Sequence, residues 1–509
     1  MGTRTPRHFA IVLLLGAWLA LGLFGHDPWK PDEAYTFGLV YEALEKGDWL
    51  VPTLAGQPFM EKPPLFFWSA ALLAKAFGEV LPLPEAARLA SALYVGLALF
   101  FTWLAAGRRI AAPLLLAGCL GYLEHAHQLI TDNALLAGIA IGFYGLCESR
   151  GLVLGTGAGI AFLSKGLIGP GVLGLTALFL PAFPAWRGSW RQWGFAVAAL
   201  APWLLVWPWL LYRHSPALFG EWLWVNNLGR FTGAAELGGV QDHWHYAKAL
   251  VWFALPAWPL ALWAFFRRPG SPQVQLGFLA FAVTFGVLSA SASARTLYGL
   301  PLLVPLVVVA SLELDSAPRW LAWLLERAAL WAAGLAALAL WGAWLAVLAG
   351  WRPELLERFG PGFAPRLQAS WLFAALAVTA LCACCLRLEP HLPVRWLAAV
   401  TLAWGLAMTL WMPWIDYGKT YRGVAEDLRR HWPPVAGCVA GRSLSEPQRA
   451  MFEYFAGLLT VPESSADCPL LLVNGASPEP PPAGSRWRLA WHGTRPGDTK
   501  EWFWLFRRF

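Results

Sequence analysis

The chain has 509 residues, of which 58% are hydrophobic and 14% are charged, and its formal net charge is +7. A soluble globular protein carries about 25% charged residues, so this composition excludes an ordinary soluble domain and favours a polytopic membrane protein. The excess of Lys and Arg agrees with the positive-inside bias of membrane proteins. It forms no basic stripe of the kind that nucleic-acid binding needs, so no nucleic-acid partner is expected.

Apolar runs separate short clusters of charged residues throughout positions 1–415. A membrane-spanning helix needs roughly 20 such residues, and most of the runs approach that length. We therefore expect an all-α membrane domain over 1–415 with about 13 transmembrane helices. The predicted spans, in chain order, are 9–25, 88–106, 110–124, 134–147, 152–163, 167–183, 193–212, 247–266, 274–290, 297–312, 327–349, 370–386 and 395–414.

Basic residues fall in every second loop between these runs, including Arg108 and Arg267. The positive-inside rule then places the N-terminus and these loops in the cytoplasm. The first outer loop becomes residues 26–86. Within it the run from Pro63 to Phe77 is apolar, but it is short and contains Lys75. We expect an interfacial helix there rather than a span.

The tail, residues 416–509, lacks long apolar runs and by the same register lies outside the cytoplasm. It alternates short strand-like runs with a helical stretch from Glu446 to Leu458, which predicts a small α/β domain. Cys438 begins one strand-like run, and Cys468 directly precedes another. If the two strands are neighbours, the sulfurs come within bonding reach, and we expect a disulfide in an oxidising periplasm.

The outer segments also hold ionisable residues that the register brings to one face of the membrane. These are Asp32, Glu61, Lys62, Asp132, Lys165, Arg230, His243, His245 and Arg295. Ionisable groups at membrane depth are costly and commonly functional. Cations can hold a lipid-linked phosphate, and a carboxylate can accept the proton of an acceptor hydroxyl. For Asp32 and Asp132 the alternative is a helix cap, because each precedes or begins a predicted helix.

Several runs occur in an order typical of one enzyme family. In the first loop they are DEAY (32–35), GDWLVP (47–52) and GQPFMEKPPLFFW (56–68); later come Asp132, SKG (164–166), NNLGRF (226–231) and SASARTLYGLP (291–301). This pattern resembles the bacterial polyprenyl-phosphate glycosyltransferases of the glycosyltransferase C superfamily. That family includes the aminoarabinose transferases of lipid A and is similar to the protein O-mannosyltransferases. The resemblance covers roughly residues 10–420 and implies 13 spans, with two juxtamembrane helices in the first loop.

The resemblance implies roles for individual residues. Asp32 and Asp132 resemble the two catalytic acids of the family, and Lys62 resembles the residue that meets the carrier phosphate. Further candidates for binding the donor phosphate are Arg295, Tyr298, Lys165 and Arg230. Candidates for binding substrate are Glu33, Tyr35 and Glu61.

A bound metal ion is a weaker expectation. Glu61 matches a position that binds metal in some relatives, but a histidine of those relatives is replaced here by Asn226 or Asn227. Either His243 or His245 would have to complete such a site. No cofactor is therefore expected to be required.

The sequence predicts an inverting glycosyltransferase of the bacterial inner membrane with its active site and C-terminus in the periplasm. Its partners would be a polyprenyl (undecaprenyl) phosphate sugar donor and a glycan, glycolipid or protein acceptor, such as lipid A. Two other classes stay open. A transporter or flippase of lipid-linked sugars would carry polar residues along several spans. A non-catalytic envelope assembly protein would act through its tail.

Overall fold

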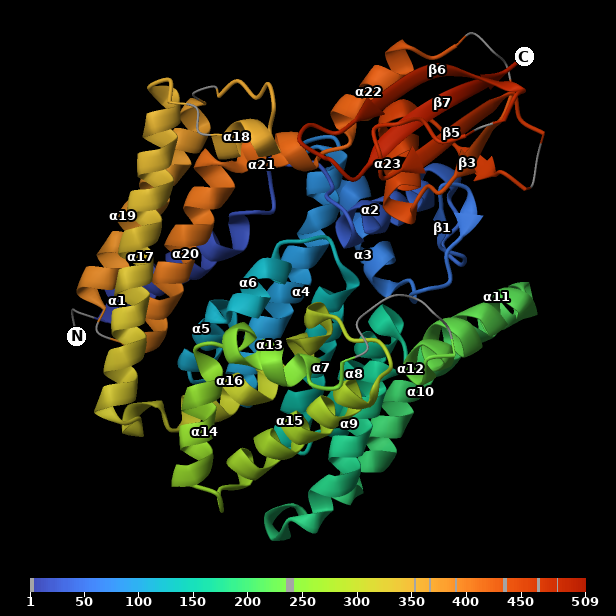
Figure 1. Cartoon of the computed structure of the whole chain (residues 1–509). Helices are drawn as coiled ribbons and strands as arrows, with labels where there is room; N and C mark the ends of the chain where they lie inside the picture. The colour runs from blue at the N-terminus through green and yellow to red at the C-terminus, as the bar shows by residue number, and fades with distance from the viewer. Residues whose placement is uncertain are drawn as a thin grey trace.

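The computed structural model describes residues 4–234, 242–351, 354–365, 368–389, 391–433, 437–464, 467–482 and 484–509. Helices form the body of the molecule, and a five-stranded sheet forms the tail at the upper right of Figure 1. The α-helices are α1 (Arg4–Ala20), α2 (Asp32–Lys46), α3 (Leu65–Phe77), α4 (Leu83–Ala105), α5 (Ala111–Gly118), α6 (Leu120–Ala126), α7 (Thr131–Cys147), α8 (Gly151–Lys165), α9 (Ile168–Phe179), α10 (Trp193–His214), α11 (Pro216–Gly220), α12 (Arg230–Thr232), α13 (His245–Phe253), α14 (Ala257–Arg267), α15 (Pro272–Ala290), α16 (Leu303–Leu312), α17 (Arg319–Leu348), α18 (Glu354–Phe359), α19 (Ala369–Leu388), α20 (Leu392–Leu410), α21 (Met412–Lys419), α22 (Arg422–Arg430) and α23 (Glu446–Ala456).

Shorter elements connect these helices. The 3₁₀ turns are η1 (Leu180–Ala182), η2 (Pro184–Trp186), η3 (Ser189–Gln192), η5 (Thr296–Leu302) and η6 (Leu314–Ser316), and the π-helix is η4 (Glu221–Gly229). The strands are β1 (Thr53–Leu54), β2 (Gln57–Pro58), β3 (Val439–Arg442), β4 (Thr460–Pro462), β5 (Leu470–Gly475), β6 (Trp487–Thr494) and β7 (Trp502–Arg508).

Within the described part of the chain, six helices are long and apolar enough to cross a membrane. They are α4, Pro184–His214, α15, α17, Ala369–Arg387 and α20. A seventh span is possible by length if α13 and α14, which meet at 99°, count as one. The chain is thus a mostly helical, multi-pass membrane protein, and the count of about 13 spans stays a prediction.

Several predicted spans are apolar helices of only 10–17 residues. Helix α7 has 17 residues. At about 1.5 Å per residue it is shorter than the roughly 30 Å hydrocarbon core. Helix α7 packs closely on α8: a Cβ added to Gly138 would lie 2.6 Å from the backbone nitrogen of Ala161. Most of its residues are buried, so contact with neighbouring helices contributes to its apolar sequence.

The first outer loop contains two helices. Helix α2 follows Pro31 and ends at Gly47, whose φ of 71° is the left-handed conformation that glycine adopts readily. The apolar run from Pro63 to Phe77 forms α3, which has 13 residues and buries Phe66 and Phe67. Both helices lie beneath the tail in Figure 1.

The tail is the α/β domain that the sequence predicts. Its sheet has the order β4-β3-β5-β7-β6, with β3 parallel to β4 and β5, and β7 antiparallel to β5 and β6. Helix α23 lies between this sheet and the first loop, because Phe452 packs on Phe503 of β7 at 5.0 Å while Tyr454 packs on Phe37 of α2 at 4.7 Å.

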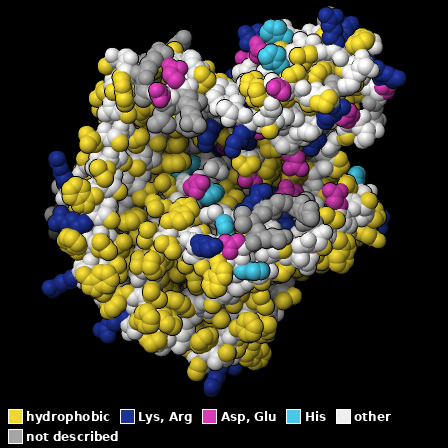
Figure 2. Space-filling view, in the orientation of Figure 1, with side chains coloured by type: hydrophobic (Ala, Val, Ile, Leu, Met, Phe, Trp, Pro, Cys, Tyr) yellow, Lys and Arg dark blue, Asp and Glu magenta, His cyan; other side chains and the backbone are white. Residues whose placement is uncertain are grey.

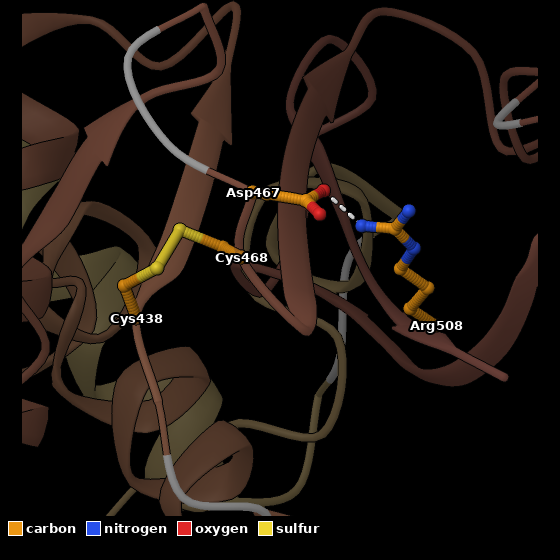
Figure 3. Close-up of a disulfide and its surroundings, with 4 residues drawn as sticks. All are labelled: Cys438, Asp467, Cys468 and Arg508. Carbon is orange, nitrogen blue, oxygen red and sulfur yellow. Dashed lines mark hydrogen bonds and ion pairs between the residues drawn. A yellow bond between two sulfur atoms is a disulfide. The ribbon is translucent and has the colours of Figure 1, made fainter.

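Cys438 and Cys468 form a disulfide, with their Cα atoms 5.0 Å apart. They lie just before β3 and β5, which are paired in register from Val439 and Leu470 (Figure 3). The pairing of the two strands is the reason that these sulfurs meet.

Candidate active site

Asp32 is the first residue of α2, and its carboxylate does not cap the helix. The cap is Pro31, which makes no side-chain hydrogen bond. One helical turn later the Tyr35 hydroxyl donates a hydrogen bond of 2.7 Å to Asp32 Oδ1. The carboxylate is therefore directed by side-chain partners rather than by the helix end, which disfavours the helix-cap alternative.

Two cations face the same carboxylate. The buried Lys62 donates a hydrogen bond to the Tyr35 hydroxyl, and its Nζ lies 3.8 Å from Asp32 Oδ1. Arg295 Nη1 approaches that oxygen from another segment, also at 3.8 Å. Burial alone would raise the pKa of Asp32, but Lys62, the Tyr35 hydroxyl and Arg295 hold the pKa below its ordinary value. Asp32 is thus ionised at neutral pH.

Lys62 keeps its charge although it is buried. Burial would lower the pKa of the ammonium, but Glu61 and Asp32 together hold the pKa above its ordinary value. A buried ammonium flanked by carboxylates is a positive group that an incoming anion can use.

Asp132 lies in the first turn of α7 and pairs with Lys165 at the end of α8. It makes no cap hydrogen bond. The side chain is buried, and Oδ2 has no hydrogen-bond partner among the described residues. Lys165 Nζ lies 4.0 Å from the centroid of the Tyr298 ring. Asp132 therefore positions an ammonium group beside Tyr298.

Glu61 is held by a guanidinium rather than by histidines. Arg230 Nη1 lies 2.5 Å from Glu61 Oε1. His243 Nδ1 lies 2.9 Å from the Ser289 carbonyl oxygen, and His245 is 3.3 Å from the Thr296 hydroxyl. The described residues contain no group of three His, Cys, Asp or Glu side chains that could hold a metal ion. The geometry gives no support to a metal site on Glu61 with His243 or His245.

Glu33, one of the substrate-binding candidates, lies apart from this cluster. It is buried against Arg88 of α4, with Arg88 Nε 2.6 Å from Glu33 Oε1. It also accepts hydrogen bonds from the backbone nitrogens of Trp29 and Leu129. Successive helical residues point in different directions, so Asp32 faces the site while Glu33 ties the first loop to α4 and to the segment just before α7.

Two cavities meet at these residues. The apolar cavity, about 280 Å³, has Lys62, Lys165, Arg230 and Tyr298 at its polar end and continues between α9 and α15. The polar cavity, about 430 Å³, shares Glu61 and Arg230 with the apolar cavity and is walled by Asp32, Arg295 and the start of α23. Figure 2 shows acidic and basic side chains gathered in a hollow between the tail and the largely hydrophobic body.

No family model matches the chain. Over 328 residues it is 28% identical to an undecaprenyl phosphate-alpha-4-amino-4-deoxy-L-arabinose arabinosyl transferase of Pseudomonas savastanoi pv. phaseolicola, a match that covers 58% of this chain and 60% of the relative. A second transferase of the same description, from Pseudomonas fluorescens, is 29% identical over 334 residues, covering 60% of this chain and 56% of the relative. The family resemblance is confirmed. In sequence, the chain spans little more than half the length of these arabinosyl transferases.

The fold likeness extends further than the sequence match. The crystal structure of ArnT from Cupriavidus metallidurans bound to undecaprenyl phosphate superposes with a TM-score of 0.72, covering 99% of this chain and 98% of ArnT, at 17% identity. The apo structure of the same ArnT gives a TM-score of 0.70 at 16% identity. The chain therefore has the ArnT fold, the tail domain included.

Two carboxylates at the site are not among the residues that the sequence predicts. Glu221 of η4 and Glu446 of α23 both line the polar cavity. The only local signal for Glu446 is its place at the start of a helix, after Ser445, which says nothing about the cavity. Its proximity to Glu61 depends on how the tail docks, and no local pattern encodes that.

Proposed function

We propose that the chain is an integral-membrane glycosyltransferase that moves a sugar from a polyprenyl (undecaprenyl) phosphate carrier to an acceptor of the bacterial envelope, such as lipid A. The observation that carries this proposal is the ionised Asp32 held between Lys62 and Arg295, where the apolar and polar cavities meet. A lipid phosphate needs cations beside an apolar groove, and this chain has both. The names of its relatives support the same donor and sugar class.

The apolar cavity suits the carrier's hydrocarbon chain. Leu167 and Leu175 line it, and their side chains are 39% and 37% exposed, so the cavity has an apolar wall at the outer surface of the helices. An isoprenoid chain could enter from the bilayer there and leave its phosphate at the polar end. Lys62 and Arg295 would hold that phosphate, with Lys165, Arg230 and Tyr298 beside it.

The reaction would invert the configuration of the sugar. The acceptor oxygen forms a new bond to the anomeric carbon, and the bond from that carbon to the phosphate oxygen breaks with its electron pair on the phosphate. Asp32 orients the acceptor and takes the proton of an acceptor hydroxyl. An acceptor phosphate would need no base, and Asp32 would then orient it. Asp132 acts through Lys165. No cofactor or divalent metal is required for these steps.

We further propose the predicted membrane arrangement: about 13 spans over 1–415, a cytoplasmic N-terminus, and a periplasmic active site and tail (416–509). The basic loops support it, because alternate loops carry arginine. A disulfide at Cys438 and Cys468 suits an oxidising compartment and supports the location of the tail.

The described residues favour a transferase over a flippase or an assembly protein. A transporter would need polar groups along its helices at mid-membrane. Here Asp32, Lys62, Asp132 and Arg295 all sit at helix ends or in loops. An assembly protein has no need of carboxylates and cations facing one another at the junction of two cavities.

Mass spectrometry of envelope glycolipids from cells with and without this protein tests the proposal. We expect one glycolipid, such as lipid A, to lose a sugar-sized mass when the protein is absent. The Asp32→Asn variant should fail to restore it, whereas Glu45→Gln, an exposed acid on the same helix, should restore it. An unchanged glycolipid and glycoprotein profile would contradict the proposed activity.

A further inference from the structure

The polar cavity is walled by three distant parts of the chain. The first loop contributes Asp32 and Glu61, η4 contributes Glu221, and the tail contributes Glu446 and Pro447. Its volume of about 430 Å³ lies within the range of about 300–1,000 Å³ that small-molecule sites occupy. The tail domain therefore forms part of the wall of the site rather than standing beside it.

The charges of this cavity are not balanced evenly. Asp32 faces Lys62 and Arg295, and Glu61 pairs with Arg230. The carboxylate of Glu446 has no hydrogen bond or ion pair within the described ranges. Burial together with Glu61 raises its pKa above the ordinary value, although the charges of Arg449, Lys62 and Arg230 oppose this. A partly buried acceptor that faces a cavity without a protein donor is suited to a donor group on a ligand.

The position of Glu446 is fixed by the packing of α23. Ser445 and Gln448 form a reciprocal capping box around it. One turn along, Arg449 Nη1 donates a hydrogen bond of 2.6 Å to Gln57 Oε1 of the first loop. Ala450 packs against Gly38 of α2. These contacts fix the backbone at Glu446 relative to the first loop, so its side chain projects from a set place at the cavity wall, as a specificity contact requires.

We propose that Glu446 is a specificity-determining residue: a carboxylate, supplied by the tail domain, that accepts hydrogen bonds from the hydroxyl or ammonium groups of a carbohydrate in the polar cavity. The inference rests on the proposed function and deepens it. Asp32 and the cations act at the reacting atoms, whereas Glu446 selects the sugar. That sugar belongs either to the loaded carrier or to the acceptor.

Binding measurements on the purified full-length chain in lipid nanodiscs test this role. The probes are undecaprenyl phosphate, undecaprenyl phosphate-4-amino-4-deoxy-L-arabinose and lipid A. Glu446→Gln should weaken the binding of either the sugar-loaded carrier or lipid A by about 10- to 100-fold, the range expected for a lost hydrogen bond to a charged group. The binding of bare undecaprenyl phosphate should be unchanged. The probe whose binding is weakened shows whether Glu446 contacts the sugar of the carrier or that of lipid A.

Two further variants separate recognition from structure. Glu446→Asp keeps the negative charge at the helix start but withdraws the carboxylate from the cavity. A binding role therefore predicts weaker binding of the sugar-bearing probe, whereas a helix-stabilising role predicts unchanged binding. Glu479→Gln makes the same charge change at an exposed tail position and should bind all probes like the wild type. Unchanged binding of every probe by Glu446→Gln, or equal weakening of all three, would overturn the assignment. If the wild-type chain binds neither carrier, the proposed function itself fails, and the assignment with it.

Discussion

Gly38 of α2 and Ala450 of α23 meet so closely that a Cβ added at residue 38 would lie 2.6 Å from the Ala450 Cβ. The same Cβ would also lie 2.6 Å from Leu54 Cδ1. Glycine at this position lets the tail dock directly on the helix that begins with Asp32. The contact links the outermost domain of the molecule to its candidate catalytic acid.

Gly38→Ala should destabilise this junction, because either α23 or Leu54 must move. Overpacking of a tight contact costs about 1–3 kcal/mol. Gly96→Ala on α4 is the matched control, since nothing lies within 4 Å of its added Cβ. We expect faster proteolysis of the tail in Gly38→Ala and no change in Gly96→Ala. Equal proteolysis of the two variants would contradict a close helix–helix contact.

Asp32→Asn should reduce sugar transfer by about 10²–10⁴-fold, the usual effect of losing a positioned general base. The isosteric amide keeps the hydrogen bond from Tyr35 and removes only the charge, so insertion and folding should be retained. Turnover with a purified loaded carrier measures the effect. Near-normal turnover would show that Asp32 has only a structural role at the start of α2.

Lys62→Ala should weaken the binding of undecaprenyl phosphate, because the buried ammonium is a charge that can face the phosphate. Lys75→Ala on α3 is the control, since Lys75 is exposed and outside the site. Binding of the bare carrier in nanodiscs distinguishes the two variants. If both bind like the wild type, the phosphate site lies elsewhere, with Arg295 as the next candidate.

The contact between the first loop and the tail should depend on pH through Glu42 and Glu453. Burial, with the Glu42 carboxylate beside it, raises the pKa of Glu453 from 4.5 to about 8. Between pH 4.5 and about 8, Glu453 therefore keeps its proton in the folded state and has lost it in the unfolded state. The free energy of unfolding should fall as pH rises from about 4.5 to about 8 and level off above that range.

Glu453→Gln should flatten this dependence, because the amide is permanently neutral. Thermal unfolding of the nanodisc-embedded protein, measured from pH 5 to pH 9, provides the comparison. Glu426→Gln on α22, an exposed acid of the same domain, should keep the wild-type slope. The same slope in wild type and Glu453→Gln would show that the carboxyl pair does not titrate as the structure implies.

The Cys438–Cys468 disulfide should keep both tail cysteines from reacting with a thiol reagent in denatured, unreduced protein. The bond closes a loop of 30 residues. On the chain-entropy model a loop of about 30 residues contributes roughly 3–4 kcal/mol. Cys438→Ala should accordingly lower the unfolding temperature of the tail. Free labelling of both cysteines without reductant would show that the bond is absent, and a cytoplasmic tail would then have to be considered again.

The sequence predicts some of this architecture because the signal is local. The short apolar run from Pro63 to Phe77 stops where α3 stops, and the strand-like runs beside Cys438 and Cys468 are the paired β3 and β5. Span number is harder to predict, because α7 and α8 are apolar for contact with each other as well as with lipid.

The residues of the candidate site also differ in how far the sequence predicts them. Asp32, Lys62 and Asp132 lie in motifs that can be recognised along the chain, and the structure brings Asp32 and Lys62 together. Glu33 is adjacent in sequence to Asp32, yet it points in a different direction from α2 and pairs with Arg88. Glu446 reaches the cavity only through tertiary docking, which no spacing of residues reveals.

The hydrogen bond between Gln57 and Arg449 joins residues 392 positions apart. At about 5–20 residues per second, a ribosome needs roughly 20–80 s to pass from one to the other. During that interval the first loop and α2 have been made, but the tail domain that walls the polar cavity has not. Assembly of the site is therefore a late event in biosynthesis, and a nascent chain lacks the complete polar cavity until its tail has been made and has folded.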